Sequence, residues 1–386
     1  MGVKMSKVLF EITEDQLETG LRGYPCGYCI TSYVDPLKGL LYAGHPVSEL
    51  VRKNPEDVIS LIYFGELNGK AEFTQELRRR AFLSPKTIAA IEALPREGHP
   101  MKFFSAALLI LGMIEGVNDY KEDCLNVIAK IPHLAAVVIN THAGWGKSPK
   151  LQPELGYMES FTKLLQVPGK KSCELEEVFR LFNILHLDHG GGNLSAFVGK
   201  AVASGLEDIY GSLTASLCAL AGSRHGKANQ DSLIFVEEVL QQVGENATEK
   251  DIETFLQKKV GMGELIFGFG HAVLRVEDPR ATVLYEYAEK KHSDHPLVKI
   301  AMLLRKVAPK VLAKNPKISC PYPNIDAISG TLLTAAGFGY PSYFTVLFGL
   351  ARCVGVAIQI VYERIEAREG KGTPIVRPKY IYKARK

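Results

Sequence analysis

The stretch Leu265–Arg280 reads LIFGFGHAVLRVEDPR, and it combines an apolar start with two glycines, one histidine and a late arginine. Gly268 and Gly270 come just before His271. Glycines around a single imidazole indicate backbone that must approach another group closely. The Gly-x-Gly spacing does not match a dinucleotide-binding fingerprint, because Val273 stands where the third glycine would be and no strand–helix unit encloses it.

The second half of this stretch predicts the start of a helix. Asp278 is suited to cap a helix and Pro279 to occupy its first position, so Arg280 falls in the first turn. Free N–H groups and the helix dipole favour an anion there, and an arginine adds a cation that binds carboxylates or phosphates. The sequence therefore predicts an anion site at Arg280. The alternative is a tight turn before an ordinary surface helix.

Helical periodicity dominates the sequence outward from this stretch, from residue 48 to 365, without a βαβ pattern, heptad run or internal repeat. Residues 1–45 are rich in glycine and β-branched side chains and predict short strands or loops. We therefore expect an all-α fold with minor β structure near the N-terminus. One helix is predicted to begin at Asn54-Pro55, and an apolar segment is expected to split at Pro132. The other predicted helices are 73–80, 84–94, 101–114, 121–131, 134–138, 159–166, 173–189, 213–222, 232–242, 249–260, 279–290, 297–313, 327–336 and 342–364.

Composition limits the class of protein and its surroundings. The 386 residues are 46% apolar and 23% charged, which is ordinary for a globular protein of two or three domains. A net charge of +4 gives no support to nucleic-acid binding. Seven scattered cysteines without a secretory pattern indicate a reducing compartment, and the N-terminus lacks the arginine-rich pattern of a transit peptide, so we expect a cytoplasmic location. Cys26 and Cys29 have redox-motif spacing, but no βαβ pattern surrounds them and no second pair completes a zinc site.

One apolar segment, 343–362, is nearly long enough to cross a bilayer. Arg352 lies near its middle and Gln359 follows further on. A central arginine is costly in lipid and usually marks a site in a protein interior. We interpret this segment as a buried core helix that carries a functional cation, and we expect no membrane partner.

The cluster His186-Leu187-Asp188-His189 ends a predicted amphipathic helix and precedes three glycines. Two histidines three residues apart would share a helical face, and with Asp188 they suit a divalent metal, given further ligands. Alternatively, the histidines favour the C-terminal end of the helix dipole and the glycines simply end the helix. A third interpretation is a hydrogen-bonding wall for an anionic substrate.

Two further clusters supply a histidine and a carboxylate. His225 lies in GSRHGKANQ, just before an expected helix start, where the dipole disfavours a charged imidazole. A neutral ring there can donate a hydrogen bond to a carbonyl, and a solvated loop histidine is the alternative. Asp326 lies in NIDAISG, where it is either a site carboxylate or the N-cap of the following helix.

Together the clusters provide several histidines, one aspartate and the arginines Arg280, Arg352 and Arg377. This set suits proton abstraction beside a carbonyl on a substrate with several carboxylates. From about Gly39 to Lys379 the chain resembles the citrate synthase family in its eukaryotic-like form. The motifs that carry the resemblance are HLDHGGGNLSAF, ALAGSRHGKANQ, GFGHAVLRVEDPR, NIDAISG and a late Arg377-Pro378.

The resemblance implies an acyltransferase that condenses acetyl-CoA with oxaloacetate and hydrolyses citryl-CoA, without a metal or other cofactor. Asp326 would remove a proton from the acetyl methyl group, and His225 would hydrogen-bond the enol oxygen. His271 would polarise and protonate the oxaloacetate carbonyl. The residues implied to hold oxaloacetate are His189, Asn193, Arg280, Arg352 and, from the second subunit of a homodimer, Arg377.

The resemblance also implies a division of the chain. Residues 1–225 and 332–386 would form a large helical domain with the dimer interface, and residues 226–331 a small domain that binds the acyl-CoA. The residues expected at CoA are Leu265, Ile266, Phe267, Gly268, Gly270, Arg275, Lys314, Lys317 and Asn324. Ala43 and segment 139–144 lack arginines that relatives carry, and Gly190 replaces a usual glutamate. The arginine losses affect the contacts to the CoA phosphates, for which Arg275, Lys314 and Lys317 are the candidate replacements.

Other functions remain open at the level of sequence. A 2-methylcitrate synthase would use propionyl-CoA instead, and the two differ in a pocket size that the sequence does not reveal. A metal-dependent hydrolase would use His186, Asp188 and His189. A catalytically inactive binding protein is disfavoured by the intact His225, His271 and Asp326 set. ATP-driven citrate cleavage is disfavoured because no nucleotide-grasp module is present in this length.

Overall fold

The computed structural model describes residues 8–385 apart from 68–70, 171 and 317, and this part of the chain contains sixteen α-helices and one three-stranded sheet. The predicted all-α fold with minor β structure near the N-terminus is confirmed. The strands are β1 (Ser32–Asp35), β2 (Gly39–Tyr42) and β3 (His45–Pro46). The helices are α1 (Val47–Leu50), α2 (Pro55–Phe64), α3 (Ala71–Arg80), α4 (Pro85–Glu92), α5 (Pro100–Glu115), α6 (Tyr120–Ala143), α7 (Tyr157–Leu164), α8 (Ser172–His186), α9 (Leu194–Ala203), α10 (Ile209–Leu220), α11 (Ala228–Val243), α12 (Glu249–Gly261), α13 (Pro279–His292), α14 (Pro296–Leu312), α15 (Asp326–Ala335) and α16 (Phe344–Val361).

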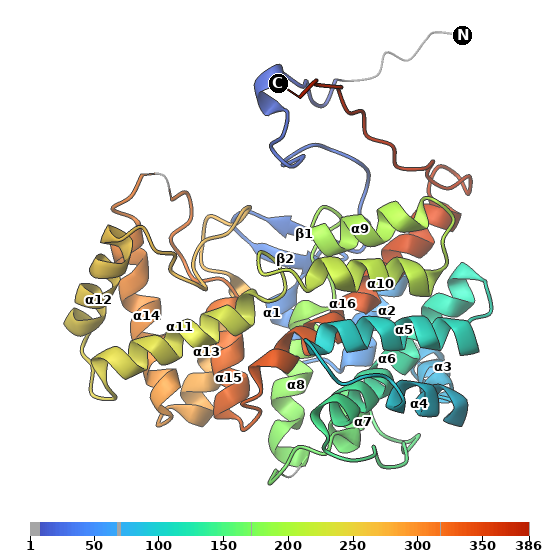
Figure 1. Cartoon of the computed structure of the whole chain (residues 1–386), viewed down its shortest axis with the longest axis horizontal. Helices are drawn as coiled ribbons and strands as arrows, with labels where there is room; N and C mark the ends of the chain where they lie inside the picture. The colour runs from blue at the N-terminus through green and yellow to red at the C-terminus, as the bar shows by residue number, and fades with distance from the viewer. Residues whose placement is uncertain (1–7, 68–70, 171, 317, 386) are drawn as a thin grey trace.

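The helices gather into two groups (Figure 1). Helices α11–α15, coloured yellow to orange, lie at one side, where α11 packs on α14 and α15, and α13 packs on α15. The other group centres on α16, which packs on α6, α8, α9 and α10. Contacts of α8 with α15 and of α11 with α16 join the groups. The predicted domain boundary at residue 331 falls inside α15, and the division into a large and a small domain remains a prediction.

The small sheet links the two groups. β2 pairs with both β1 and β3 in antiparallel register, with Ser32 opposite Tyr42. Gly39 lies against the start of α13, where an added Cβ would meet Pro279 at 2.6 Å. Buried Tyr42 donates its hydroxyl proton to the Ile184 carbonyl at 2.9 Å, which fixes the sheet to the last turns of α8. The sheet therefore holds the end of α8 close to the start of α13.

Helix α6 runs without a break through Pro132, so the predicted split into two segments is wrong. A proline inside a helix removes the hydrogen bond to the carbonyl four residues earlier, here that of Ile128. The hydroxyl of Tyr157, on α7, donates to the Ile128 carbonyl at 2.8 Å and replaces the missing donor. The local sequence predicted a helix break at Pro132. The Tyr157 hydroxyl, from a segment distant in the sequence, satisfies the carbonyl that the proline leaves without a donor.

Two helices of the described part of the chain are long and apolar enough to cross a membrane by length and composition. In Tyr120–Ala143 83% of the apolar window is buried in the fold, and in Pro341–Glu366 all of it is. Their apolar character is therefore explained by the core of the protein. This agrees with the interpretation of segment 343–362 as a buried core helix.

Candidate active site

Two loops far apart in the sequence, the one before His271 and the one before α15, are joined by hydrogen bonds at the centre of the candidate site. Phe269 and Pro323 form an antiparallel bridge. The Asn324 N–H donates to the Gly268 carbonyl at 2.9 Å, and the Asn324 side-chain amide donates to the Gly270 carbonyl at 2.9 Å. Asn324, in the loop before α15, thus donates two hydrogen bonds to the loop before His271. The pairing brings the loop before His271 to the loop before α15.

The close approach that the glycines predicted is to the first turn of α15. Gly268 has a φ of +80°, and a Cβ added there would lie 2.6 Å from the Cα of Ala327. No other residue fits this conformation and this contact without strain. The contact places His271 and Asp326 on adjoining segments.

His271 is held in one tautomer. Its Nδ1 accepts the backbone N–H groups of Val273 at 3.0 Å and Leu274 at 2.9 Å. A ring nitrogen that accepts two N–H groups carries no proton, so the proton of the neutral ring is on Nε2. Burial, reinforced by the charge of Arg280, lowers the pKa of His271 to about 4. Near neutral pH His271 is therefore an uncharged hydrogen-bond donor.

Asp326 is the first residue of α15, and its carboxylate does not cap the helix. The N-cap is Ile325, and the Asp326 N–H instead donates to the Asn324 side-chain oxygen at 2.9 Å. Burial raises the pKa of Asp326 to about 6, while the positive charge of Arg280 acts in the opposite direction. A carboxyl with a pKa near neutrality is suited to accept and return a proton.

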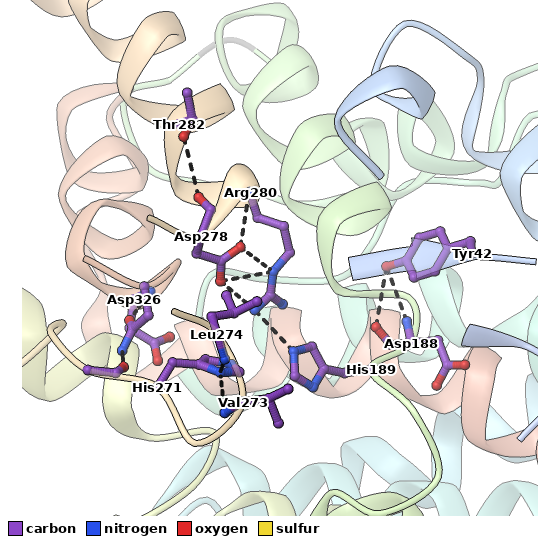
Figure 2. Close-up of polar contacts among 12 residues, drawn as sticks. Tyr42, Asp188, His189, His271, Val273, Leu274, Asp278, Arg280, Thr282 and Asp326 are labelled. Carbon is purple, nitrogen blue, oxygen red and sulfur yellow. Dashed lines mark hydrogen bonds and ion pairs between the residues drawn. The ribbon is translucent and has the colours of Figure 1, made fainter. Parts of the chain in front are cut away.

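Arg280 lies in the first turn of α13, as predicted, and Asp278 caps this helix by accepting the Arg280 N–H at 3.0 Å. The same carboxylate receives the guanidinium, with Nη2 2.7 Å from Oδ2 and Nε 3.1 Å from Oδ1. Figure 2 shows the guanidinium between Asp278 and His189, whose Nε2 accepts from Nη2 at 3.3 Å. The rings of His189 and His271 lie 5.7 Å apart. Burial holds the pKa of His189 well below its usual value.

The metal-site interpretation of His186, Asp188 and His189 does not fit the contacts. Helix α8 ends at His186, so the two histidines do not share a helical face and the predicted helix 173–189 is three residues too long. The Asp188 carboxylate is occupied by Thr31 at 2.5 Å, Ser32 at 2.7 Å and Gln359 at 2.8 Å. Among the residues described, no group of three or more histidine, cysteine, aspartate or glutamate side chains could hold a metal ion.

His186 is instead a buried structural ring. Its Nδ1 donates to the Phe182 carbonyl at 2.7 Å, and the two rings stack with centroids 4.1 Å apart. Burial lowers the pKa of His186 to about 3. The ring is therefore neutral.

Arg352 is buried in the middle of α16, as the sequence predicted. Its Nε donates to the His186 carbonyl at 3.3 Å, and its guanidinium carbon lies 4.8 Å from the centre of the Phe348 ring. Burial lowers the pKa of Arg352 to about 10. Gly355, three residues further along α16, approaches the residue after α8 closely: its N–H donates to the Leu187 carbonyl at 3.1 Å, and an added Cβ would lie 2.5 Å from that oxygen. Within the described residues Arg352 forms no ion pair.

His225 precedes α11 and contacts Ser195 at the start of α9. The Ser195 N–H donates to His225 Nε2 at 3.3 Å, and the Ser195 hydroxyl lies 2.9 Å from the same nitrogen. An N–H can only donate, so the proton of the neutral His225 ring is on Nδ1. Burial lowers the pKa of His225 to about 4, with Arg352 acting in the same direction. Asn193 caps α9, a helix that the sequence did not predict, and its side-chain oxygen accepts the Ser195 hydroxyl at 2.8 Å.

Several predicted site residues lie apart from this group. Arg377 is exposed on the C-terminal tail, and among the described residues it contacts none of the site. Lys314 pairs with Glu253 at 3.3 Å, and Lys317 lies outside the described residues. The Arg275 guanidinium donates to the Leu274 carbonyl at 2.8 Å within its own loop. The remaining residues expected at CoA, Leu265, Ile266 and Phe267, precede the Gly268 contact, with Leu265 and Phe267 exposed and Ile266 buried.

Several residues that shape the site were not recognised as such from the sequence. Asp278 was predicted only as a cap, although its position two residues before Arg280 at a helix start could have suggested the ion pair. Ser195, Thr31 and Ser32 carry no local signal, because their partners lie far away in the sequence.

The comparisons with known proteins agree with this geometry. Residues 20–379 match the family described as citrate synthase, C-terminal domain. The mitochondrial citrate synthase of Citrus maxima is 35% identical over 400 residues, which cover 97% of this chain and 83% of the relative.

The chain belongs to the citrate synthase family.

Citrate synthase 4 of Arabidopsis thaliana, also mitochondrial, is 33% identical over the same shares. The citrate synthase of Thermotoga maritima has the same fold, with a TM-score of 0.80, 25% identity and 96% of each chain covered. That of Thermoplasma acidophilum, in a ternary complex with carboxymethyl coenzyme A and oxaloacetate, has a TM-score of 0.80 at 24% identity, covering 95% of this chain and 96% of that one. The predicted family and its acyltransferase activity are confirmed.

The predicted cytoplasmic location is wrong. The curated relatives from Citrus maxima, Daucus carota and Arabidopsis thaliana are all named mitochondrial, and they point to that compartment. The prediction used scattered cysteines and a missing sequence pattern. Free cysteines report a reducing environment, and neither observation identifies a compartment.

Proposed function

We propose that this protein condenses acetyl-CoA with oxaloacetate and hydrolyses the resulting citryl-CoA to citrate and CoA at the site around Arg280. The observation that carries this proposal is the gathering of His189, His271, Arg280 and Asp326 by the paired loops. It joins a carboxyl of raised pKa, neutral imidazoles and a buried cation.

Asp326 and His225 act on acetyl-CoA in this proposal. The Asp326 carboxylate accepts a proton from the acetyl methyl group, for which its pKa of about 6 keeps it ionised yet basic at neutral pH. The Nδ1–H of His225 donates to the thioester oxygen and stabilises the enol. A neutral donor suits this role because it lowers the barrier to enol formation by hydrogen bonding.

His271 and the arginines act on oxaloacetate. The Nε2–H of His271 donates to the keto oxygen and protonates it as the new carbon–carbon bond forms. Arg280, Arg352, His189 and Asn193 hold the carboxylates, since arginines form strong charge-assisted bonds to them. Arg352 is suited to this role because nothing acidic within the described residues pairs with it.

We further propose a homodimer in which Arg377 reaches the site of the partner subunit. The N- and C-terminal segments expose apolar side chains that a lone chain leaves in water, with exposed fractions of 70% for Val8, 68% for Ile381 and 90% for Tyr382. The tail is anchored to the end of α9 by the Val376 N–H, which donates to the Ser204 hydroxyl at 2.9 Å. Arg377 follows at once and is exposed.

We also keep the proposal that residues 226–331 form a small domain that binds the acyl-CoA. Oxaloacetate would bind first and draw this domain closed. Small-angle scattering with and without oxaloacetate tests this. Identical profiles, with acetyl-CoA binding equally well to the free protein, would contradict ordered binding.

The activity is tested by thiol release with oxaloacetate and either acetyl-CoA or propionyl-CoA. We expect faster release with acetyl-CoA, release only when oxaloacetate is present, and no loss after chelator treatment. A preference for propionyl-CoA would assign 2-methylcitrate synthesis. Thiol release independent of oxaloacetate would reduce the protein to a thioesterase, and loss with chelator would favour the metal-dependent hydrolase.

A further inference from the structure

Cys26 and Cys29 lie in the segment that leads into β1, and the proposed reaction uses neither of them. Both are free thiols, with Cys26 exposed and Cys29 half-buried. We propose that these two cysteines form a reversible disulfide, and that the disulfide weakens oxaloacetate binding through the loop that carries His189. The disulfide chemistry stands alone, whereas the effect on oxaloacetate rests on the proposed function.

A chain of hydrogen bonds connects Cys29 to the site. The Sγ of Cys29 lies 3.3 Å from the Thr31 hydroxyl oxygen, and that hydroxyl donates to the Asp188 carboxylate at 2.5 Å. The Thr31 proton is thus committed to Asp188, so the Cys29 S–H is the donor to Thr31. Asp188 directly precedes His189, which touches Arg280.

Cys29 also lies directly on the glycine loop that follows His189. A Cβ added to Gly191 would lie 3.4 Å from the Cβ of Cys29 and 2.7 Å from the Lys200 ammonium. Lys200 is itself fixed by Glu363 at 3.1 Å. The glycine loop after His189 therefore lies close to both Cys29 and the buried Lys200–Glu363 ion pair. A movement of Cys29 is expected to displace this loop, because little free space surrounds Gly191.

Disulfide formation requires this segment to change. From Tyr24 to Cys29 the backbone contains neither a turn nor a bend. Three residue steps of extended chain span about 10 Å, whereas disulfides need Cα atoms within about 7 Å. Gly27, between the cysteines, gives the backbone the freedom to fold. Closure turns the Cys29 sulfur away from Thr31, and oxidation removes the S–H that Thr31 accepted.

The proposed oxidant is a low-molecular-weight disulfide. The exposed Cys26 thiolate attacks one of its sulfurs and expels one thiolate, which leaves a mixed disulfide on the protein. The Cys29 thiolate then attacks the Cys26 sulfur and expels the second. The two protein thiols give up two electrons and two protons, which the two departing thiols carry away.

The test uses the full chain before and after incubation with oxidised glutathione. Peptide mapping is expected to find a Cys26–Cys29 link, and calorimetry a Kd for oxaloacetate raised about two- to tenfold, the effect of losing one hydrogen bond. Dithiothreitol is expected to restore binding. Cys26→Ser removes the partner but keeps the Cys29 S–H, so its binding is expected to be insensitive to oxidant. Cys173→Ser, at another exposed cysteine, is the matched control and is expected to respond like the wild type.

Two results would overturn the proposal: no Cys26–Cys29 link, or a linked protein with unchanged oxaloacetate binding. Failure of the proposed function is separate, because it would appear as absent thiol release in the fully reduced protein. Mapping and calorimetry need no turnover, so they decide the disulfide in either case.

Discussion

The region around Arg280 and the region around Arg352 both bury a cation, but they compensate it differently. Burial acts to lower the pKa of Arg280, yet attraction to Asp278 outweighs it and the pKa is raised. Arg352 forms no ion pair within the described residues and contacts a backbone carbonyl and the Phe348 ring, and burial outweighs the attraction of Asp188 and lowers its pKa to about 10. A buried ion pair is already neutralised within the fold. A buried cation without an ion-pair partner is instead stabilised when an anionic ligand binds beside it. The difference agrees with the proposal that Arg280 serves both the fold and the site, whereas Arg352 binds the substrate.

The largest expected effect is in the Arg280 region, where Asp326 is the proposed base. Asp326→Asn keeps the size of the side chain but cannot accept the methyl proton, so we expect turnover to fall about 10²–10⁴-fold. Thiol release measures the rate, and calorimetry is expected to show nearly unchanged oxaloacetate binding. A variant with more than about a tenth of the wild-type rate would show that Asp326 is not the base.

The contrast between the two arginines predicts opposite effects on stability. Arg280→Met leaves the Asp278 carboxylate buried and unpaired, so we expect a loss of about 3–5 kcal/mol in the free energy of unfolding. Arg352→Met removes a buried cation that forms no ion pair within the described residues, so we expect unchanged or higher stability together with weaker oxaloacetate binding. Denaturant titration measures stability, and Arg52→Met, at an exposed arginine, serves as control. Equal destabilisation by the two buried substitutions would remove the distinction drawn here.

A third arginine, Arg377, is proposed to act in the site of the partner subunit. Arg377→Ala is expected to weaken oxaloacetate binding about tenfold, since one charge-assisted carboxylate contact is lost. Mixing this variant with Asp326→Asn lets a hybrid site combine an intact Asp326 with the partner's intact arginine. Activity is then expected to recover partly after subunit exchange. Confirmed hybrid dimers without recovery would place Arg377 in its own chain's site.

The smallest expected effect is the pH dependence of activity and stability that the Asp326 carboxyl produces. Because the folded protein raises the pKa of Asp326 from 3.8 to about 6, kcat/KM is expected to fall as pH drops through about 6. The same shift means that the folded state binds this proton more tightly than the unfolded chain. Asp326 therefore favours folding less as pH rises from about 4 to 6, by at most about 3 kcal/mol. Asp326→Asn is expected to unfold at a higher temperature at pH 7.5, and an unchanged melting temperature would contradict the raised pKa.

Local sequence determined much of the fold and several site positions. Helical periodicity gave the helical class, and Asp278-Pro279 gave the start of α13 with Arg280 in its first turn. The glycine pair before His271 predicted a close backbone approach, which the contact of Gly268 with Ala327 supplies. The lone arginine in an apolar segment predicted a buried cation. Each of these follows from backbone preference or side-chain chemistry within a few residues.

Only the tertiary structure decided the remainder, because it depends on partners far away in the sequence. Pro132 does not break α6, since Tyr157 supplies the donor to Ile128. Asp326 could have been a cap or a base, and the Asn324 amide together with burial settles its environment. Local propensity fixes what a segment prefers when alone. The free energy of burying a charge or leaving a carbonyl unpaired is known only once the neighbours from other segments are in place.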